Sequence, residues 1–335
     1  MTSLLGSSGE KMVNQQLERA VAATATEVAT DIAYLRDLIV NLFFVGAPGA
    51  ADRSWALVDA GVSGAAGRIA RAAAERFGEG SRPGAIVMTH GHFDHIGALK
   101  QLAERWDVPV YAHELELPYL SGRSAYPPPD PTVGGGAMAA LSRLYPRGPI
   151  DLGPRLHTLP ADGAVPAMPG WKWIHTPGHT AGHVSFFREE DRALIAGDAV
   201  VTTKQESMLA VLTQREEVHG PPAYYTTNWE EARESVQRLA TLEPALLATG
   251  HGRPLRGEQM LRGLHVLAAD FQRHAVPTRG RYVREPAITD ANGVVAVPPP
   301  VPDRLPKILA GAGIAAAIAY TALRRRDSGS PRREK

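Results

Sequence analysis

The sequence predicts an α/β protein whose β-sheets are covered by helices. Strand-like apolar segments alternate with helical segments in the first half of the chain, strand-like segments follow one another near residues 171–196, and helical segments return near residues 228–274. A sheet with an apolar face must bury that face against helices or a second sheet. The chain has 335 residues, 44% of them hydrophobic, which is enough for a large core.

The N-terminal half supplies the alternating part of this pattern. Residues 1–29 are rich in Ala, Thr and Gln, and we expect a helical or frayed leader segment there. Branched and aromatic side chains predict strands in residues 31–45 (one or two strands), 55–59, 85–89 and 108–112. Apolar residues at helical spacing predict helices in residues 65–77, which end at Gly78, and in residues 97–106.

The C-terminal half supplies the consecutive strands and the second set of helices. Residues 121–149 are rich in Pro and Gly, so we expect a loop that carries a short helix. Strands are predicted in residues 171–175, 184–188, 193–196 and 245–248. Helices are predicted in residues 228–242 and 257–274.

These elements divide the chain into four predicted parts. They are the leader segment at residues 1–29, one main domain at residues 30–275, a Pro-rich linker at residues 276–306, and a small-residue apolar helix with a basic tail at residues 307–335. The linker is predicted from VPPPVP and its surroundings, because such Pro-rich sequence is typically extended.

The C-terminal helix carries an uncharged run of 16 residues at 308–323, between Lys307 and Arg324. A membrane-spanning helix usually needs about 20 apolar residues, and much of this run is Ala and Gly. We expect a helix that packs on the main domain or on a partner. The alternative is membrane association through residues 308–323, with the basic end on the cytoplasmic face. The N-terminus lacks the basic start and long apolar stretch of a secretory signal.

Charge and cysteine content narrow the function classes. There are 36 Lys and Arg residues against 35 Asp and Glu residues, and this balance gives no electrostatic reason to expect a nucleic acid partner. The sequence contains no Cys, which excludes disulfides and thiolate ligands. Any metal ion would therefore be held by His, Asp or Glu. The absence of disulfides suits a cytoplasmic protein.

A dense group of metal-ligand residue types follows the predicted strand at residues 85–89. The sequence THGHFDHIG places three His and one Asp within six positions, namely His90, His92, Asp94 and His95. Imidazole and carboxylate groups are typical ligands of zinc and similar ions. One regular helix would put His90, His92 and Asp94 on different faces, whereas a loop can turn them toward one point. The cluster therefore predicts a metal site.

Three later segments repeat the plan of an apolar strand, a glycine and a ligand. His179 lies in HTPGHTAGH, Asp198 follows LIAG, and His251 lies between two glycines in LLATGHGRP. A carboxylate at a strand end can bridge two cations. Ligands on loops at strand ends suit a site that a rigid scaffold supports.

The ordered set of ligands resembles that of the metallo-β-lactamase fold hydrolases, over about residues 30–260. The first loop matches the HxHxDH pattern of that family, and single His, Asp and His residues follow in the family's order. The resemblance implies an αββα sandwich with two mixed β-sheets covered by helices, and a two-metal site at one edge. It implies that His90, His92 and His179 hold the first ion, that Asp94, His95 and His251 hold the second, and that Asp198 bridges them.

The resemblance also implies the chemistry. Two divalent ions, with Zn²⁺ expected first and iron or manganese also fitting the ligands, would activate a water molecule for hydrolysis. Asp94 is assigned a second, catalytic role in handling a proton. His92 argues against the oxygen-reducing di-iron branch, which carries a glutamate at that place. We therefore expect a glyoxalase II-like or lactonase-like hydrolase that acts on a small-molecule ester, thioester or lactone.

Two alternatives to this function remain open. The first is a phosphodiesterase of the same fold, because a metal ion can polarise a phosphoryl oxygen as well as a carbonyl oxygen. The second is a membrane-tethered or partner-binding protein with a mainly structural metal site. Structural zinc sites are closed by four protein ligands, and seven ligands for two ions leave open positions, which favours catalysis.

Five further residues are expected to support the metal site or contact the substrate. Asp59 ends the strand before Gly61 and looks like the buried aspartate with which this family supports its metal loop. His183 is expected to hold the loop of His179 by hydrogen bonds, and His113 to line the pocket or support a ligand. Tyr224 and Tyr225 lie between the bridging aspartate and the last histidine, and either could bind a substrate oxygen or pack under the loop.

Overall fold

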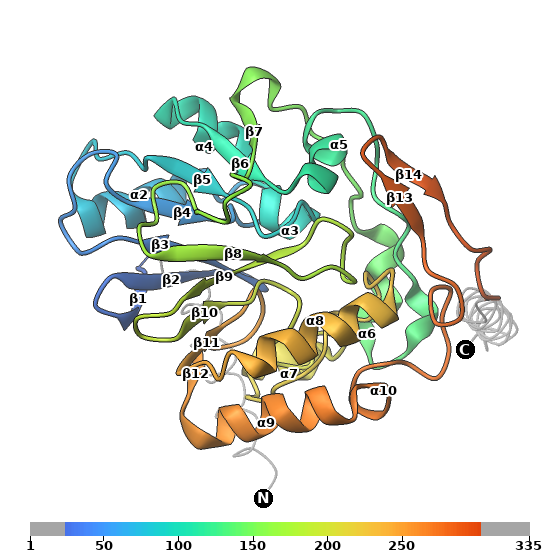
Figure 1. The fold of residues 1–335 in the computed structure, drawn as a ribbon. Coiled ribbons are helices and arrows are strands. Elements are labelled where there is room, and N and C mark those ends of the chain that lie inside the picture. Colours follow the sequence, from blue (N-terminus) through green and yellow to red (C-terminus); the bar gives the residue numbers. More distant parts are fainter. Residues whose placement is uncertain (1–23, 303–335) are drawn as a thin grey trace, which may run out of the picture. The chain divides into compact units, whose positions relative to one another are not determined.

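The computed structural model describes residues 24–302 and contains two large mixed β-sheets (Figure 1). The first has seven strands in sequence order: β1 (Thr26–Ala29), β2 (Ile32–Asp37), β3 (Val40–Val45), β4 (Ala56–Val58), β5 (Ala85–Val87), β6 (Val110–Ala112) and β7 (Leu156–Thr158). Strands β1 to β4 pair antiparallel and β4 to β7 pair parallel. The change of direction at β4 makes this sheet mixed.

The second sheet has five strands in the order β12-β11-β10-β9-β8. They are β8 (Trp171–His175), β9 (Val184–Arg188), β10 (Ala193–Ile195), β11 (Leu246–Ala248) and β12 (Leu255–Arg256). Only β10 and β11 pair parallel in this sheet, because the long segment between them returns the chain in the same direction.

The two sheets pack face to face and helices cover their outer faces. One core cluster joins both sheets, with Phe43 and Val58 from the first and Phe186 and Ile195 from the second. The outer face of the first sheet is covered by α2 (Ala66–Phe77) and α4 (Leu99–Trp106), and that of the second by α8 (Trp229–Thr241) and α9 (Gly257–Ala269). This is the αββα sandwich that the resemblance implied.

Shorter elements lie in the connections. They are α3 (Phe93–Ile96), η1 (Glu114–Glu116), α5 (Leu117–Leu120), η2 (Pro131–Val133), α6 (Ala137–Leu141), η3 (Ser142–Leu144), η4 (Gly153–Arg155), α7 (Met208–Thr213) and α10 (Phe271–His274). The expected loop at 121–149 with a short helix is present, since α6 lies within it.

Two expectations about local structure were wrong. The end of the predicted helical or frayed leader forms β1, because Thr26 and Glu27 pair with β2. Residues 276–306 do not form one extended linker, because β13 (Ile288–Asp290) and β14 (Gly293–Ala296) form a hairpin within them. Val294 donates a backbone hydrogen bond to Ser124 Oγ, which ties the hairpin to the main domain. The four-part division itself stays a prediction.

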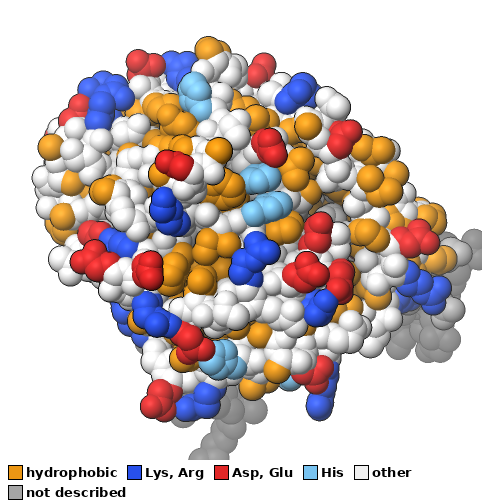
Figure 2. Space-filling model, viewed as in Figure 1, with side chains coloured by type: hydrophobic (Ala, Val, Ile, Leu, Met, Phe, Trp, Pro, Cys, Tyr) orange, Lys and Arg blue, Asp and Glu red, His pale blue; other side chains and the backbone are white. Residues whose placement is uncertain are grey.

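The predicted C-terminal helix at 307–335 lies outside the described residues. Among the helices of residues 24–302, none has the length and apolar character needed to cross a bilayer. On the surface, acidic and basic side chains are interspersed over the face shown in Figure 2.

Candidate metal centre

Every predicted ligand lies just after the end of a β-strand. His90, His92, Asp94 and His95 follow β5, and the last two lie on the short helix α3. His179 follows β8, Asp198 follows β10, and His251 follows β11. The structure brings all seven side chains together in three overlapping groups: His90, His92 and His179; His90, His95 and Asp198; and Asp94, His95 and His251.

Asp198 lies at the centre of these groups. Its Oδ2 atom is 3.0 Å from His251 Nε2 and 3.5 Å from His179 Nε2, and its Oδ1 atom is 3.6 Å from His95 Nε2. His251 Nε2 also lies 3.6 Å from Asp94 Oδ2. The carboxylate of Asp198 therefore contacts residues from both predicted ligand sets, as a bridging ligand would.

Backbone geometry makes room for this carboxylate. A Cβ atom on Gly250 would lie only 2.0 Å from Asp198 Oδ1, so only glycine fits beside the ligand at this position. Gly197 has a φ of 54°, and a Cβ there would lie 2.6 Å from His183 Nε2. The glycines of the strand, glycine and ligand pattern thus allow the close approach of backbone to the cluster.

Hydrogen bonds on the far side of two imidazoles fix their tautomers. Asp59 Oδ2 lies 2.8 Å from His95 Nδ1 and accepts its proton, so the lone pair of neutral His95 is on Nε2. Thr89 donates its hydroxyl proton to Asp59 Oδ2 at 2.7 Å, so Thr89 Oγ1 accepts from His90 Nδ1 at 3.1 Å. His90 Nε2 is then also unprotonated, which is the form that binds metal ions.

Hydrogen bonds at Nδ1 also fix the tautomers of His179 and His251. Thr226 donates to the carbonyl of Pro222, so its oxygen accepts from His179 Nδ1 at 3.3 Å. His251 Nδ1 donates to the carbonyl of Ile39 at 2.6 Å. In the neutral form, both imidazoles therefore present an unprotonated Nε2 to the cluster. His92 differs, because its Nδ1 faces the cluster and lies 3.0 Å from His179 Nε2.

The cluster contains buried polar atoms with no hydrogen-bond partner. His90 Nε2, His95 Nε2 and Asp198 Oδ1 make no hydrogen bond within the described part of the chain. Buried polar groups are nearly always paired, so each exception needs an explanation. Lone pairs of imidazole and carboxylate that face one another are explained by cations between them, and the donor set fits divalent metal ions.

The pKa values of three histidines and of Asp198 agree with this interpretation. Burial lowers the pKa of His90 and His92 well below the usual value and that of His179 to about 3, so these imidazoles are neutral. Burial raises the pKa of the Asp198 carboxyl, but His251 and His95 outweigh this and hold it well below its ordinary range. Neutral imidazoles around an ionised carboxylate are the protonation states that metal binding requires.

His95 and His251 shift in the opposite direction. Burial lowers the pKa of His95, but the carboxylates of Asp59 and Asp198 raise it well above the usual value. The pKa of His251 is also raised, because Asp198 outweighs the effect of burial. A metal ion at these nitrogens would compete with the proton, so metal binding should release protons and weaken as the pH falls.

The five residues that were expected to support the metal site or contact the substrate make different contacts. Asp59 contacts His95 and Thr89, as described above. Both nitrogens of His183 are used within the fold: Nε2 accepts from the backbone N–H of Asp198 at 2.9 Å, and Nδ1 contacts Thr176 Oγ1 at 2.9 Å. His113 stacks on His175 with ring centres 4.2 Å apart, and burial lowers its pKa to about 4.

The two tyrosines make different contacts. Tyr225 stacks on His92 with ring centres 4.2 Å apart, and its hydroxyl donates to the carbonyl of Pro146. Tyr224 is buried, and its ring lies edge-on to Tyr145 with ring centres 5.9 Å apart. Tyr225 therefore packs against the predicted ligand His92, and Tyr224 packs against Tyr145.

Three residues that the sequence reasoning missed also hold the centre together. Thr89 and Thr226 orient ligands, as shown above. Glu116 is fully buried; its Oε2 accepts from Gly91 N, and its Oε1 accepts from Gly182 N and Thr180 Oγ1. Burial raises the pKa of this carboxyl, and its hydrogen bonds oppose the rise. The only sequence signal for Glu116 was its place in YAHELE beside His113.

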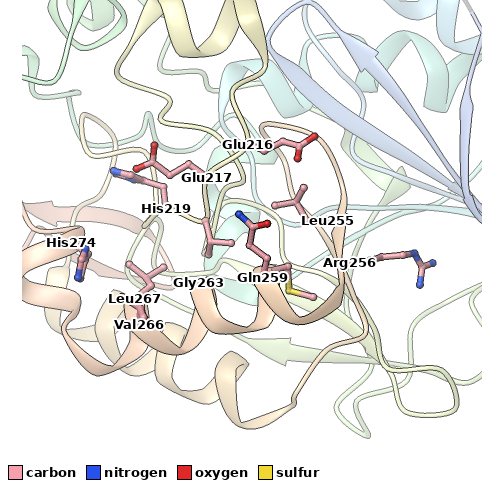
Figure 3. Close-up of a pocket in the computed structure, with 12 residues that line it drawn as sticks. Glu216, Glu217, His219, Leu255, Arg256, Gln259, Gly263, Val266, Leu267 and His274 are labelled. Atoms are coloured by element: carbon pink, nitrogen blue, oxygen red, sulfur yellow. The ribbon is translucent and has the colours of Figure 1, made fainter.

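A groove of about 380 Å³ lies elsewhere on the molecule (Figure 3). It runs between residues 216–219 and α9, with Glu217 and His219 on one side and Gly263 and Leu267 on the other. None of the predicted ligands lines it. The metal centre therefore lies apart from this groove.

Comparison with known proteins agrees with the fold. The family model of the metallo-beta-lactamase superfamily matches residues 35–251, and the chain belongs to this superfamily. The probable metallo-hydrolase YflN of Bacillus subtilis (strain 168) is 49% identical over 242 residues, which are 72% of this chain and 91% of that protein. The probable metallo-hydrolase YybB of the same organism is 31% identical over 170 residues, 51% of this chain and 64% of that protein.

Solved structures show the same fold at lower identity. A beta-lactamase domain protein from Burkholderia ambifaria superposes with a TM-score of 0.51 and 22% identity, over 75% of this chain and 77% of that one. This likeness supports the sandwich architecture described above.

Replacing Asp59 with Asn tests the role of its carboxylate. Asn can keep its oxygen toward Thr89 N, but its amide group then faces His95 Nδ1, which must become an acceptor. The proton moves to His95 Nε2, so we expect metal affinity to fall by about 10- to 100-fold. Competition with a chelator on metal-loaded protein measures this affinity. The exposed Asp52→Asn variant is the control, and equal affinity in Asp59→Asn would show that Asp59 does not orient the ligand.

Proposed function

We propose that this protein is a metal-dependent hydrolase that uses a water molecule activated by two divalent metal ions to cleave an ester, thioester or lactone. The observation that carries the proposal is the convergence of seven buried side chains, the predicted ligands, with Asp198 at their centre. Its relatives with names of probable metallo-hydrolases support the reaction class. A closed structural zinc site is formed by four protein ligands. The predicted set has seven, which favours catalysis over a purely structural role.

In this proposal the seven ligands form two sets that share one residue. His90, His92 and His179 would hold the first ion, with Zn²⁺ as the expected metal. The second ion would be held by Asp94, His95 and His251, and Asp198 would contact both ions. The bound ions would supply a nucleophilic water at neutral pH and polarise the bond to be cleaved.

Asp94 is the residue to which we assign proton transfer. It lies on α3 between His92 and His95, and its side chain is buried beside His251. Burial raises the pKa of the Asp94 carboxyl, and a metal ion bound to the carboxylate would oppose this rise. It would accept the proton that the attacking water loses.

The surroundings of the centre favour an ester-type substrate over a phosphodiester. Phe93, Tyr145, Tyr224 and Tyr225 belong to one apolar cluster with Met138. This aromatic wall beside His92 and Asp94 suits a neutral organic group rather than a chain of phosphates. We assign the hydroxyl of Tyr224, which belongs to this cluster, to the substrate oxygen.

A hydrolysis screen on metal-quantified protein tests the proposal. Esters, thioesters, lactones and phosphodiesters are offered to the wild type, and we expect an ester-type substrate to be cleaved. His92→Ala should lower kcat/KM by about 10³-fold or more, because it removes a predicted ligand. The control is His265→Ala, whose exposed side chain pairs with Glu243 and is not one of the predicted ligands.

Three other results of the screen would each change the proposal. Cleavage of phosphodiesters alone would replace the proposal with the phosphodiesterase alternative. Folded, metal-loaded protein that cleaves none of the four classes would favour a mainly structural site. Full activity in His92→Ala would contradict the assignment of the first ligand set.

A further inference from the structure

Two neighbouring side chains outside the predicted ligand set have buried polar atoms without partners. Gln205 is fully buried, and neither its Nε2 nor its Oε1 makes a hydrogen bond within the described residues. Glu206 is also buried, and its Oε2 has no partner there. Unpaired buried amide and carboxylate atoms are costly to a fold, so their presence indicates a group that these atoms bind.

Residues 202–206, which carry these two side chains, make hydrogen bonds to the predicted ligand His251 and to the residue before Tyr224. At one end, Thr202 donates its backbone N–H to the carbonyl of the ligand His251 at 3.0 Å. At the other end, Glu206 Oε1 accepts from the backbone N–H of Ala223 at 2.7 Å, directly before Tyr224. Gln205 and Glu206 therefore lie on a short stretch of chain that is tied at both ends to the walls of the centre.

This stretch is held in place without help from the Gln205 side chain. The carbonyl of Glu206 accepts from Met138 N at 3.2 Å. Gly135 packs so closely that a Cβ there would lie 2.6 Å from Glu206 Cβ. The backbone that carries the two side chains is thus held in place, as expected of a preorganised binding site.

The unpaired atoms offer a particular pattern of donors and acceptors. Gln205 supplies a donor at Nε2 and an acceptor at Oε1, and the Glu206 carboxylate supplies an acceptor at Oε2. A planar secondary amide needs one donor for its carbonyl oxygen and one acceptor for its N–H. The aromatic cluster with Tyr145 and Tyr224 next to this stretch suits the flat, apolar remainder of such a group.

We propose that Gln205 and Glu206 form a subsite that binds a secondary amide of the substrate. Gln205 Nε2 donates to the amide carbonyl, and Glu206 Oε2 accepts from the amide N–H. The inference rests on the proposed function in that it describes the substrate of the same centre. It adds that the ester-type substrate carries an amide away from the bond that is cleaved.

Two matched pairs of thioesters test the subsite on metal-loaded full-length protein. In the first pair the amide is on the thiol side: the butanoyl thioesters of N-acetylcysteamine and of pentane-1-thiol. In the second pair it is on the acyl side: the ethyl thioesters of 4-acetamidobutanoic acid and of heptanoic acid. We expect kcat/KM to favour the amide member of at least one pair by about 10- to 100-fold.

Two variants assign that preference to the subsite. Gln205→Leu removes both amide atoms, and Glu206→Gln keeps an acceptor for Ala223 while placing a donor against the substrate N–H. Both should reduce the preference to about threefold or less, chiefly through KM, with metal content unchanged. Gln205→Leu should also keep or raise Tm, because it loses no protein hydrogen bond. The control is Gln259→Leu on α9, in the groove of Figure 3.

A binding measurement separates the subsite from the hydrolysis. Ligand-observed NMR with N-butylacetamide should show binding to the wild type and not to Gln205→Leu. If the amide binds in this way but none of the four thioesters is cleaved, the subsite stands and thioester hydrolysis falls. No binding together with no preference overturns the subsite, as does a preference that both variants retain. A fall in Tm of more than about 5 °C in Gln205→Leu would assign Gln205 a structural role instead.

Discussion

Replacing Asp198 with Asn is expected to remove most of the hydrolytic activity and at least one equivalent of bound metal. The carboxylate contacts His95, His179 and His251, which belong to both predicted ligand sets. Asn has the same shape but is neutral and presents an N–H₂ group to one of these sides. We therefore expect kcat/KM to fall by about 10³-fold or more.

Elemental analysis and steady-state kinetics on the same preparations measure the effect. The proposal predicts two equivalents of metal in the wild type and one or fewer in Asp198→Asn. Glu190→Gln is a matched control, because Glu190 is an exposed acid in the turn before β10, at the other end of the strand that leads to Asp198. Two retained equivalents with more than a tenth of wild-type activity would show that Asp198 does not bridge the ions.

The grouping of the ligand residues could be predicted from the sequence because each signal is local. An apolar strand, a glycine and a ligand-type residue lie next to one another in the chain at Asp198 and at His251. The topology then needs only to align the strand ends at one edge of the sandwich. The resemblance supplied the sheet architecture that such local patterns do not contain.

The partners that fix the ligands could not be predicted in this way. Thr226 reaches His179 across 47 positions of sequence, and Glu116 reaches Thr180 across 64. Which Thr or Glu meets which loop depends on the path of the intervening chain, and hydrophobic periodicity says nothing about that path. The hairpin before the Pro-rich sequence at 298–302 was also missed. Its strands β13 and β14 have only three and four residues, which is too short for a clear alternating pattern.

Replacing Glu116 with Gln is expected to destabilise the protein and loosen both ligand loops. One carboxylate oxygen accepts from Gly91 in the loop of the first ligands, and the other accepts from Gly182 and Thr180 in the loop of His179. Tyr126 also donates to this carboxylate. In Gln, either orientation of the amide places an N–H₂ group against a backbone N–H that cannot become an acceptor.

The expected cost is about 2–4 kcal/mol of unfolding free energy, because a buried backbone donor and a charge-assisted hydrogen bond are lost together. This corresponds to a fall in Tm of about 5–15 °C for a domain of this size. Metal affinity should fall by about 10- to 100-fold, since the two loops carry His90, His92 and His179. Thermal unfolding and chelator competition measure the two effects separately.

The exposed Glu114→Gln variant in the same turn is the control, because it makes the same chemical change outside the buried network. Added metal should recover part of the lost Tm in Glu116→Gln, since ions that bind only the folded state stabilise it by mass action. A Tm and a metal affinity equal to those of Glu114→Gln would show that the buried carboxylate does not join the loops. A loss of stability with wild-type metal affinity would confine Glu116 to the fold and leave the ligand positions to Asp59, Thr89 and Thr226.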